Sequence, residues 1–355
     1  MKDKNIIKKN IRISGRTIGP GYPVFIIAEA GVNHNGSLSL AKKMVDAAKS
    51  AGADAVKFQT YKTENLVTAE CPKAAYQKKS GGCEPQFDML KRLELSRSQF
   101  EDLFYYCKKK NIIFLSTPFD QESAEFLYRL GVPAFKISSG DVSNIPFLRK
   151  VAGYKRPVIL STGMSTMAEI KDALRCMTAA GNHAIALLHC TSNYPAKFVD
   201  VNLSAMGRLN DTFKVPTGYS DHTLGIEISV AAVAAGAVII EKHFTLNKKL
   251  PGPDQSASIE PMELRNMVRS IRNVEKAVGD GIKRPRNSEL EIAKVVRKSL
   301  VAAEDIPQGS RISSPMVSVK RPGTGIAPKY FDDIVNRTTK VTIKKDSVLN
   351  WGMFK

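Results

Sequence analysis

Cysteine and histidine are scarce in this sequence, and long apolar runs are absent from it. The chain of 355 residues has five Cys and five His, and none of the Cys forms a C-x-x-C pair. An odd number of widely spaced Cys is typical of a reduced cytoplasmic protein. No apolar run is long enough to span a bilayer, and the charged start MKDKNIIKKNIRISG lacks the apolar stretch of a signal peptide. We therefore expect a cytoplasmic protein with no membrane partner.

Acidic residues are outnumbered, which leaves a formal net charge of +19 from 53 Lys and Arg against 34 Asp and Glu. Such a balance can indicate nucleic acid or an anionic membrane as a partner. Here the basic residues are spread along the chain with acidic residues among them, and no nucleic-acid recognition motif occurs. An anionic small-molecule substrate is the preferred interpretation, and no nucleic-acid partner is expected.

Short apolar runs alternate with helical patterns along most of the chain. The strand candidates are 24–31, 55–60, 112–119, 134–140, 157–163, 184–191, 216–220 and 238–245. The helical patterns are 37–52, 97–110, 121–131, 144–153, 165–181, 200–210, 223–236 and 261–278. Eight strand-then-helix units predict an α/β protein with a (β/α)₈ TIM barrel. An open doubly wound sheet is the alternative, but no G-x-G-x-x-G follows the first strand.

Polar side chains stand where the predicted strands end, which is the catalytic face of such a barrel. Strand ends are often polar because they meet water, and that explains Ser and Thr well. It explains less well Lys57 and Lys136, which lie inside the runs VKF and FKI, where a charge must be paired or bind a ligand. These two lysines are therefore candidate ligands for an anion.

The stretch 215–245 reads as strand, helix and strand, with His222 and His243 after the two strands. Because a βαβ unit makes its strands parallel, both imidazoles open on the same face of the sheet. Two neighbouring imidazoles suit a divalent metal, although buried hydrogen-bonding His residues would give the same pattern.

Four further segments stand out from the barrel pattern. Residues 1–22 form a basic leader that could fold into a small plugging hairpin. Residues 62–95 make an unusually long connection, and at the barrel mouth they would act as a lid. After a barrel domain at 1–280, the polar and basic stretch 281–294 is typical of a linker. Residues 295–355 hold short strand-like runs and turn signals, and they predict a compact second domain.

The motifs are specific enough to indicate a family, and they occur in order over nearly the whole chain. They are AEAGVNHNG (28–36), VKFQT (56–60), LSTPFD (115–120), KISSGD (136–141), STGM (161–164), HCTSNYP (189–195), GYSDHT (218–223), EKHFT (241–245), GPDQSAS (252–258) and KRPGTGI (320–326). With these motifs the chain resembles the N-acetylneuraminate (sialic acid) synthase family, including the legionaminic acid synthases. The resemblance implies a TIM barrel with a C-terminal antifreeze-like (SAF) domain.

The activity that the resemblance implies is a transferase reaction of phosphoenolpyruvate with open-chain N-acetylmannosamine. The products are N-acetylneuraminate and phosphate, and a divalent metal, Mn²⁺ or Mg²⁺, is required. The alternative substrate is 2,4-diacetamido-2,4,6-trideoxymannose, which a legionaminic acid synthase uses. The partners are then phosphoenolpyruvate and an N-acyl amino sugar.

The resemblance also assigns roles to individual residues. His222 and His243 are implied as the metal ligands, and Glu29 as the carboxylate that orients or deprotonates water. The implied phosphoenolpyruvate ligands are Lys57, Thr117, Lys136, Ser139, Ser161, Asn193 and Ser220. The implied sugar contacts are Gln59, Asp141, Tyr194, Asp254 and Arg321. Asp141 departs from the family pattern, which commonly has Glu there, and this leaves the exact sugar open.

Arg321 lies in the second domain, and the resemblance implies that it reaches the barrel of another subunit. A homodimer with exchanged C-terminal domains is then expected.

Two other classes of function remain as alternatives. A Schiff-base aldolase would use Lys136 or Lys242. A carbohydrate- or nucleic-acid-binding protein would use the basic second domain and show salt-dependent polymer binding.

Overall fold

Eight parallel strands form a barrel in the computed structural model, which describes residues 8–73 and 85–355. The strands are β3 (Phe25–Gly31), β4 (Ala55–Thr60), β5 (Ile113–Pro118), β6 (Phe135–Ile137), β7 (Val158–Ser161), β8 (Ile185–Cys190), β9 (Thr217–Asp221) and β10 (Ile239–His243). Hydrogen bonds join them in the order β5-β4-β3-β10-β9-β8-β7-β6, and β5 also contacts β6, which completes the ring. The prediction of a (β/α)₈ barrel is confirmed, and the open sheet is excluded.

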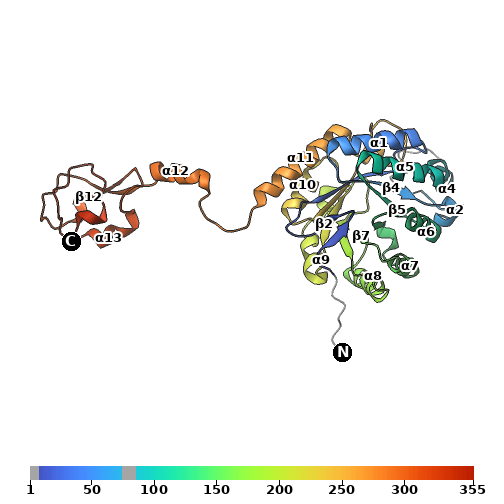
Figure 1. The fold of residues 1–355 in the computed structure, drawn as a ribbon, viewed down its shortest axis with the longest axis horizontal. Helices are drawn as coiled ribbons and strands as arrows, with labels where there is room; N and C mark the ends of the chain where they lie inside the picture. The colour runs from blue at the N-terminus through green and yellow to red at the C-terminus, as the bar shows by residue number, and fades with distance from the viewer. Residues whose placement is uncertain (1–7, 74–84) are drawn as a thin grey trace, which may run out of the picture. The chain divides into compact units, whose positions relative to one another are not determined.

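Helices surround the strands, as Figure 1 shows. They are α1 (Leu38–Ala51), α5 (Arg97–Lys110), α6 (Gln121–Leu130), α7 (Ile145–Gly153), α8 (Met167–Ala179), α9 (Ala205–Phe213), α10 (Glu227–Ala234) and α11 (Pro261–Val278). Local chemistry sets their ends. At α1 the Ser37 hydroxyl accepts the N–H of Leu40, and Gly52 closes the helix at φ +87°. These eight helices occupy the positions that the helical periodicity predicts.

The predicted and observed boundaries differ most at β6, α9 and α10, and α10 begins at Glu227 instead of residue 223. Strand β6 ends at Ile137 instead of 140, because the Ser138 hydroxyl accepts the N–H of Gly140 and turns the chain into a 3₁₀ turn at Ser139–Asp141. Helix α9 begins at Ala205 instead of residue 200. The shorter β6 brings the serines of the KISSGD motif to the rim of the barrel.

The N-terminal leader forms a hairpin of β1 (Ile11–Ile13) and β2 (Arg16–Ile18) that is packed into the barrel. Its three isoleucines share one apolar cluster with the first inward-facing residues of the strands, such as Phe25 and Ile239. Burial of each isoleucine side chain contributes about 1.5–3 kcal/mol. The hairpin therefore closes the N-terminal end of the barrel, as the sequence suggested, and leaves the carboxyl end for chemistry.

The long connection after β4 contains α2 (Thr63–Leu66) and α4 (Gln86–Leu93). Its two described parts are joined to each other, because the Tyr61 hydroxyl donates to the carbonyl of Leu90 and Glu94 accepts from both the N–H and the hydroxyl of Thr63. Met89 and Leu93 share an apolar cluster with Val32, which follows β3. Residues 74–84 lie outside the described residues, so the lid remains a prediction.

The chain divides into two units, Met1–Gly279 (the barrel unit) and Asp280–Lys355 (the C-terminal unit). The C-terminal unit contains α12 (Asn287–Val296), β11 (Ser299–Ala302), an antiparallel β12 (Val317–Lys320) and α13 (Phe331–Ile334) around its own apolar core. Helix α12 lies within the stretch read as a linker. Its polar sequence reflects exposure, since none of its residues is buried, and Glu289 caps it by accepting the N–H of Arg286. In the described residues no helix is both long and apolar enough to cross a membrane.

Candidate active site

A cavity of about 340 Å³ lies at the carboxyl ends of the barrel strands, and polar side chains from all eight strands or the loops after them line it. The lining residues are Glu29, Lys57, Gln59, Thr117, Phe119, Lys136, Ser138, Ser139, Gly140, Ser161, Met164, Cys190, Ser192, Tyr194, Ser220, His222, Glu241 and His243. Eleven of the residues implied by the family motifs are therefore in one place. The cavity holds both the cationic and the imidazole candidates that the sequence singled out.

Strand alternation decides which polar residues reach this cavity. On β10 the residues Ile239, Glu241 and His243 face the barrel interior, whereas Ile240 packs among the helices. Lys242 lies on that outer face, where its ammonium is 2.9 Å from the Asp221 carboxylate. Lys242 is therefore a structural cation, and the sequence alternative that uses it as a Schiff-base lysine is wrong for this residue.

Four buried charges form a network across the floor of the cavity. The Lys57 ammonium lies 2.8 Å from a Glu29 oxygen and 3.7 Å from Glu241, and it donates to the Thr117 hydroxyl at 3.1 Å. The Lys136 ammonium lies 3.4 Å from the other oxygen of Glu241. All four charged side chains are at most 4% exposed. The two ammonium and two carboxylate groups balance in charge, which is how a protein can bury them.

The two carboxylates of this network have opposite pKa shifts. Burial raises the pKa of Glu29 to about 7, because the loss of water outweighs the attraction of Lys57. Burial also acts on Glu241, but Lys136 and Lys57 together outweigh it and lower the pKa to about 2. Glu241 therefore stays a fixed negative charge, whereas Glu29 is able to exchange a proton near neutral pH.

His222 and His243 stand side by side, with ring centroids 5.6 Å apart. Burial lowers the pKa of His222 to about 4, and burial together with the neighbouring His222 lowers the pKa of His243 well below its ordinary value. Both rings are therefore neutral at physiological pH. The Tyr194 ring lies over His222 at 4.1 Å between centroids.

The chemistry of this pair fits a divalent metal. His222 Nδ1 is 2.7 Å from the Thr191 carbonyl oxygen, so Nδ1 carries the hydrogen and Nε2 keeps a free lone pair. His243 Nδ1 is buried and has no hydrogen-bond partner among the described residues. Across residues 8–73 and 85–355, no group of three or more His, Cys, Asp and Glu side chains is arranged as a metal site. The protein would thus supply two neutral nitrogens and leave other positions open.

The hydroxyl groups of the cavity divide into bound and free ones. Ser220 donates to Glu241 at 2.9 Å, and Ser139 accepts the N–H of Gly163 at 2.9 Å. The Ser161 hydroxyl is buried without a hydrogen-bond partner in the described part of the chain. Since buried hydroxyls are normally hydrogen-bonded, Ser161 is the one that most clearly awaits a ligand.

Four residues implied by the motifs do not line the cavity. Asn193 is exposed, and its side-chain oxygen accepts the N–H of Tyr194. Asp141 is half-buried and accepts from Asn144 at 3.1 Å. Asp254 is buried, with its carboxylate 4.0 Å from His243 Nδ1. Arg321 is exposed in the C-terminal unit, so its role at the cavity stays a prediction.

Several lining residues were not among the sequence candidates, and Glu241 is the most consequential. It stands in the motif EKHFT two residues before His243, so strand alternation could have placed it beside that histidine in the cavity. The others are Phe119, Ser138, Gly140, Met164, Cys190 and Ser192. All six lie inside the motifs quoted above, but the chemistry of their side chains does not single them out among the motif residues.

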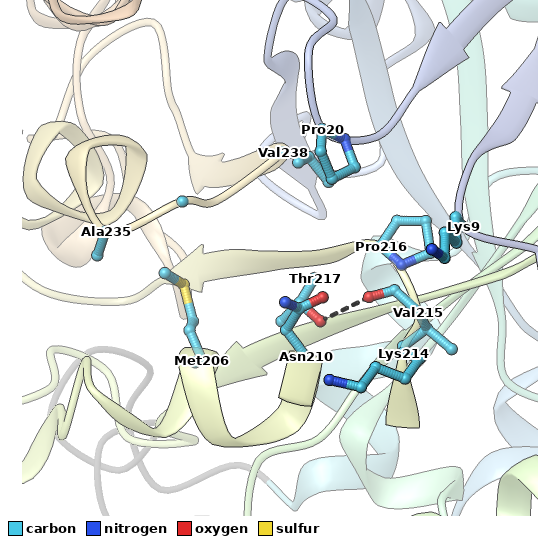
Figure 2. A pocket seen from close by; sticks show the side chains of 12 residues that line it. Lys9, Pro20, Met206, Asn210, Lys214, Val215, Pro216, Thr217, Ala235 and Val238 are labelled. Atoms are coloured by element: carbon cyan, nitrogen blue, oxygen red, sulfur yellow. Dashed lines mark hydrogen bonds between the residues drawn. The ribbon is translucent and has the colours of Figure 1, made fainter. Parts of the chain in front are cut away.

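A second hollow, of about 290 Å³, lies at the opposite end of β9 (Figure 2). Its polar lining includes the exposed Lys9 and Lys214, and Thr217, whose hydroxyl donates to the carbonyl of Val215. No carboxylate or imidazole belongs to this lining. This hollow therefore lacks the carboxylate and imidazole groups that the cavity at the carboxyl ends of the strands combines with its lysines.

Comparison with known proteins gives two family matches and several close relatives. The NeuB family profile matches residues 44–283, and the SAF domain profile matches residues 297–355. An N,N'-diacetyllegionaminic acid synthase of Campylobacter jejuni is 48% identical, over 91% of this chain and 98% of the relative. The synthase of the same name from Legionella pneumophila is 46% identical, over 96% of this chain and 98% of the relative.

Among solved structures, the N-acetylneuraminic acid synthetase of Leptospira borgpetersenii, in complex with citrate, has the same fold. It superposes with a TM-score of 0.72 at 39% identity, over 81% of this chain and 96% of that one. The fold of this chain thus has a counterpart of known architecture.

Proposed function

The chain belongs to the NeuB family, and from this premise we propose that it condenses phosphoenolpyruvate with the open-chain aldehyde of an acetamido sugar. The products are a nine-carbon 2-keto acid and phosphate. The main support for this proposal is that Lys57 and Lys136 line the same cavity as the His222–His243 pair. The two lysines suit an anionic substrate, and a metal held by the two imidazoles suits a carbonyl substrate.

The sugar that we propose is 2,4-diacetamido-2,4,6-trideoxymannose. The two relatives named as legionaminic acid synthases are more similar to this chain than the solved N-acetylneuraminic acid synthetase. N-acetylmannosamine is the second candidate, because that synthetase shares the fold and much of the sequence. Asp141, one methylene shorter than the Glu common at this position, is the implied sugar contact that bears on this choice.

Phosphoenolpyruvate binding follows from the charges of the cavity floor. Lys57 and Lys136 are held by carboxylates on one side, and their ammonium groups attract the carboxylate and phosphate of the substrate. Thr117, Ser139, Ser161 and Ser220 supply neutral donors around it. Ser161 in particular gains a partner that its burial requires.

A divalent metal, Mn²⁺ or Mg²⁺, would be held by His222 and His243. When bound, it supplies Lewis-acid polarisation of the sugar aldehyde. The chain's own residues orient the reactants so that C3 of phosphoenolpyruvate attacks the aldehyde carbon. Tyr194, which covers His222, limits the space in which the sugar can lie.

Glu29 moves the proton in the second half of the reaction. Water adds to C2 of the condensed intermediate, Glu29 accepts the proton that the water loses, and the alkoxide formed from the aldehyde oxygen gains a proton to become a hydroxyl. A carboxyl group with a pKa of about 7 is suited to this task, because it is partly ionised at neutral pH and releases the proton again easily. The tetrahedral intermediate then expels phosphate, which leaves the 2-keto acid. Gln59, which donates to Glu29 at 3.3 Å, orients the carboxylate.

A homodimer with exchanged C-terminal units completes the proposal. Met164, Phe198 and Val199 are exposed apolar residues on the barrel unit, at 75%, 62% and 88%. Such residues favour an interface with another protein surface. In the dimer, Arg321 of one subunit would contact the sugar in the barrel of the other, since a guanidinium suits an acetamido carbonyl.

The test is phosphate release from phosphoenolpyruvate by the full-length protein, after chelator treatment and Mn²⁺ add-back. Each of the two sugars is supplied in a parallel reaction. Metal-dependent release is expected, and it should be faster with the diacetamido sugar. Borohydride serves as a control for the aldolase alternative, which would need Lys136 to form a trapped Schiff base. No release with either sugar from the folded protein would refute the proposal.

A further inference from the structure

The two imidazoles of the active site differ in how their Nδ1 atoms are held. His222 donates from Nδ1 to the Thr191 carbonyl at 2.7 Å, which leaves Nε2 as the free nitrogen. His243 Nδ1 is buried and makes no hydrogen bond within the described residues. A buried polar atom without a partner is costly, so this nitrogen requires an acceptor or a donor.

Asp254 faces that nitrogen. Its Oδ2 atom is 4.0 Å from His243 Nδ1, and the two side chains are only 10% and 9% exposed. The separation is about 1 Å longer than an N–H···O bond. A hydrogen bond therefore requires the carboxylate and the imidazole to approach by about that distance.

The backbone of Asp254 is anchored to the loop after β3. Ser258 donates from its hydroxyl to the Asp254 carbonyl at 2.7 Å, and Asn33 donates to the Ser258 hydroxyl at 2.9 Å. Gln255 donates to the Asn35 side-chain oxygen at 2.9 Å. Strand β3 is also the neighbour of β10, which carries His243. The carboxylate is therefore presented to the imidazole by a fixed frame.

We propose that Asp254 is a positioning residue that accepts the Nδ1 hydrogen of His243 and so directs Nε2 of this ring into the cavity. Both imidazoles then present the same nitrogen to a divalent metal. The carboxylate also increases the basicity of the ring, as carboxylate partners of metal-binding His residues do. The inference rests on the proposed function, and it adds to the sugar contact that the family motif implies for Asp254.

The first test compares Asp254→Asn with the matched variant Asp141→Asn. Both lose a carboxylate implied in sugar binding, but among the described residues the side-chain hydrogen-bond partner of Asp141 is Asn144 and not an imidazole. Affinity for Mn²⁺ is measured without substrates, from the electron paramagnetic resonance signal of the unbound ion. Asp254→Asn should bind Mn²⁺ about 10–100-fold more weakly than the wild-type protein, and Asp141→Asn should bind it equally well. Wild-type affinity in Asp254→Asn, with a raised KM for the sugar, would overturn the proposal.

The second test needs no variant to fold. Nitrogen-15 spectra of the histidine side chains in the wild-type protein report which ring nitrogen carries the hydrogen, and the chain has only five His. The expected result is an Nδ1-protonated neutral ring for both His222 and His243. An Nε2-protonated His243 would contradict the proposal. If the wild-type protein binds Mn²⁺ but releases no phosphate, the proposed function fails, and these two measurements still decide the role of Asp254.

Discussion

Replacing Glu241 by Gln should destabilise the protein and at the same time increase its response to phosphoenolpyruvate. The substitution keeps the size of the side chain and an oxygen for the Ser220 hydroxyl, so it removes little but the charge. Lys136 then loses its carboxylate at 3.4 Å, whereas Lys57 keeps Glu29 at 2.8 Å.

The expected loss of stability follows from this difference between the two lysines. Removal of one partner from a buried ion pair costs about 3–5 kcal/mol, and the lower end applies because only one of the two lysines is left unpaired. About 3 kcal/mol corresponds to a fall in Tm of about 6 °C for a protein of this size. In the proposed binding mode phosphoenolpyruvate restores negative charge beside Lys136, so saturating substrate should raise the Tm of Glu241→Gln more than that of the wild-type protein.

The assay is thermal unfolding with and without phosphoenolpyruvate, with Glu101→Gln as the matched control. Glu101 is exposed on α5, so its substitution should change stability by less than about 0.5 kcal/mol. If Glu241→Gln and Glu101→Gln unfold at the same temperature and respond equally to substrate, Glu241 does not hold the lysine pair and the charge network has been misread.

Three other perturbations test separate parts of the structure. Lys136→Met should raise the KM for phosphoenolpyruvate about 10-fold or more. Lys242→Met should leave this KM unchanged, but it should lower the free energy of unfolding in urea by about 3–5 kcal/mol. Ile13→Ala should cost about 2–5 kcal/mol in urea unfolding with kcat unchanged, because Ile13 is fully buried at the end of the barrel away from the cavity. Glu29 has a pKa raised from 4.5 to about 7, so the folded state binds more protons than the unfolded state in this range, and stability falls as pH rises through it. Glu29→Gln should remove this fall from the stability profile; an unchanged slope between pH 4.5 and 7 would exclude Glu29 as its source.

The order of elements and the catalytic end of the barrel could be predicted from the sequence alone. Apolar runs of strand length alternate eight times with patterns of helical period, and that count admits few folds. The polar residues at the strand ends had to meet at one face, because parallel strands present their carboxyl ends together. For this reason the sequence is enough to group Lys57, Lys136, His222 and His243, and the fold brings all four together in one cavity.

The linker stretch shows a limit of composition. Residues 281–294 are polar and basic, and polarity predicts exposure correctly because α12 buries none of its residues. A polar composition does not, however, exclude a helix. The helix forms because Glu289 accepts the backbone N–H of Arg286 at its start and because the sequence contains good helix formers.

The tertiary structure alone decided which of the neighbouring polar residues act together. Strand alternation puts Glu241 on the same face of the strand IIEKH as His243, but the sequence cannot say which charged groups Glu241 and Lys242 meet. Register and closure of the barrel place Glu241 between the two lysines and pair Lys242 with Asp221 outside. The approach of Asp254 to His243 depends likewise on a loop held by distant residues. The sequence by itself determined which chemical groups are present and which end of the barrel bears them, because the strand and helix pattern follows from local periodicity. The distances between these groups depend on the tertiary structure, because they arise from contacts between segments far apart in the chain.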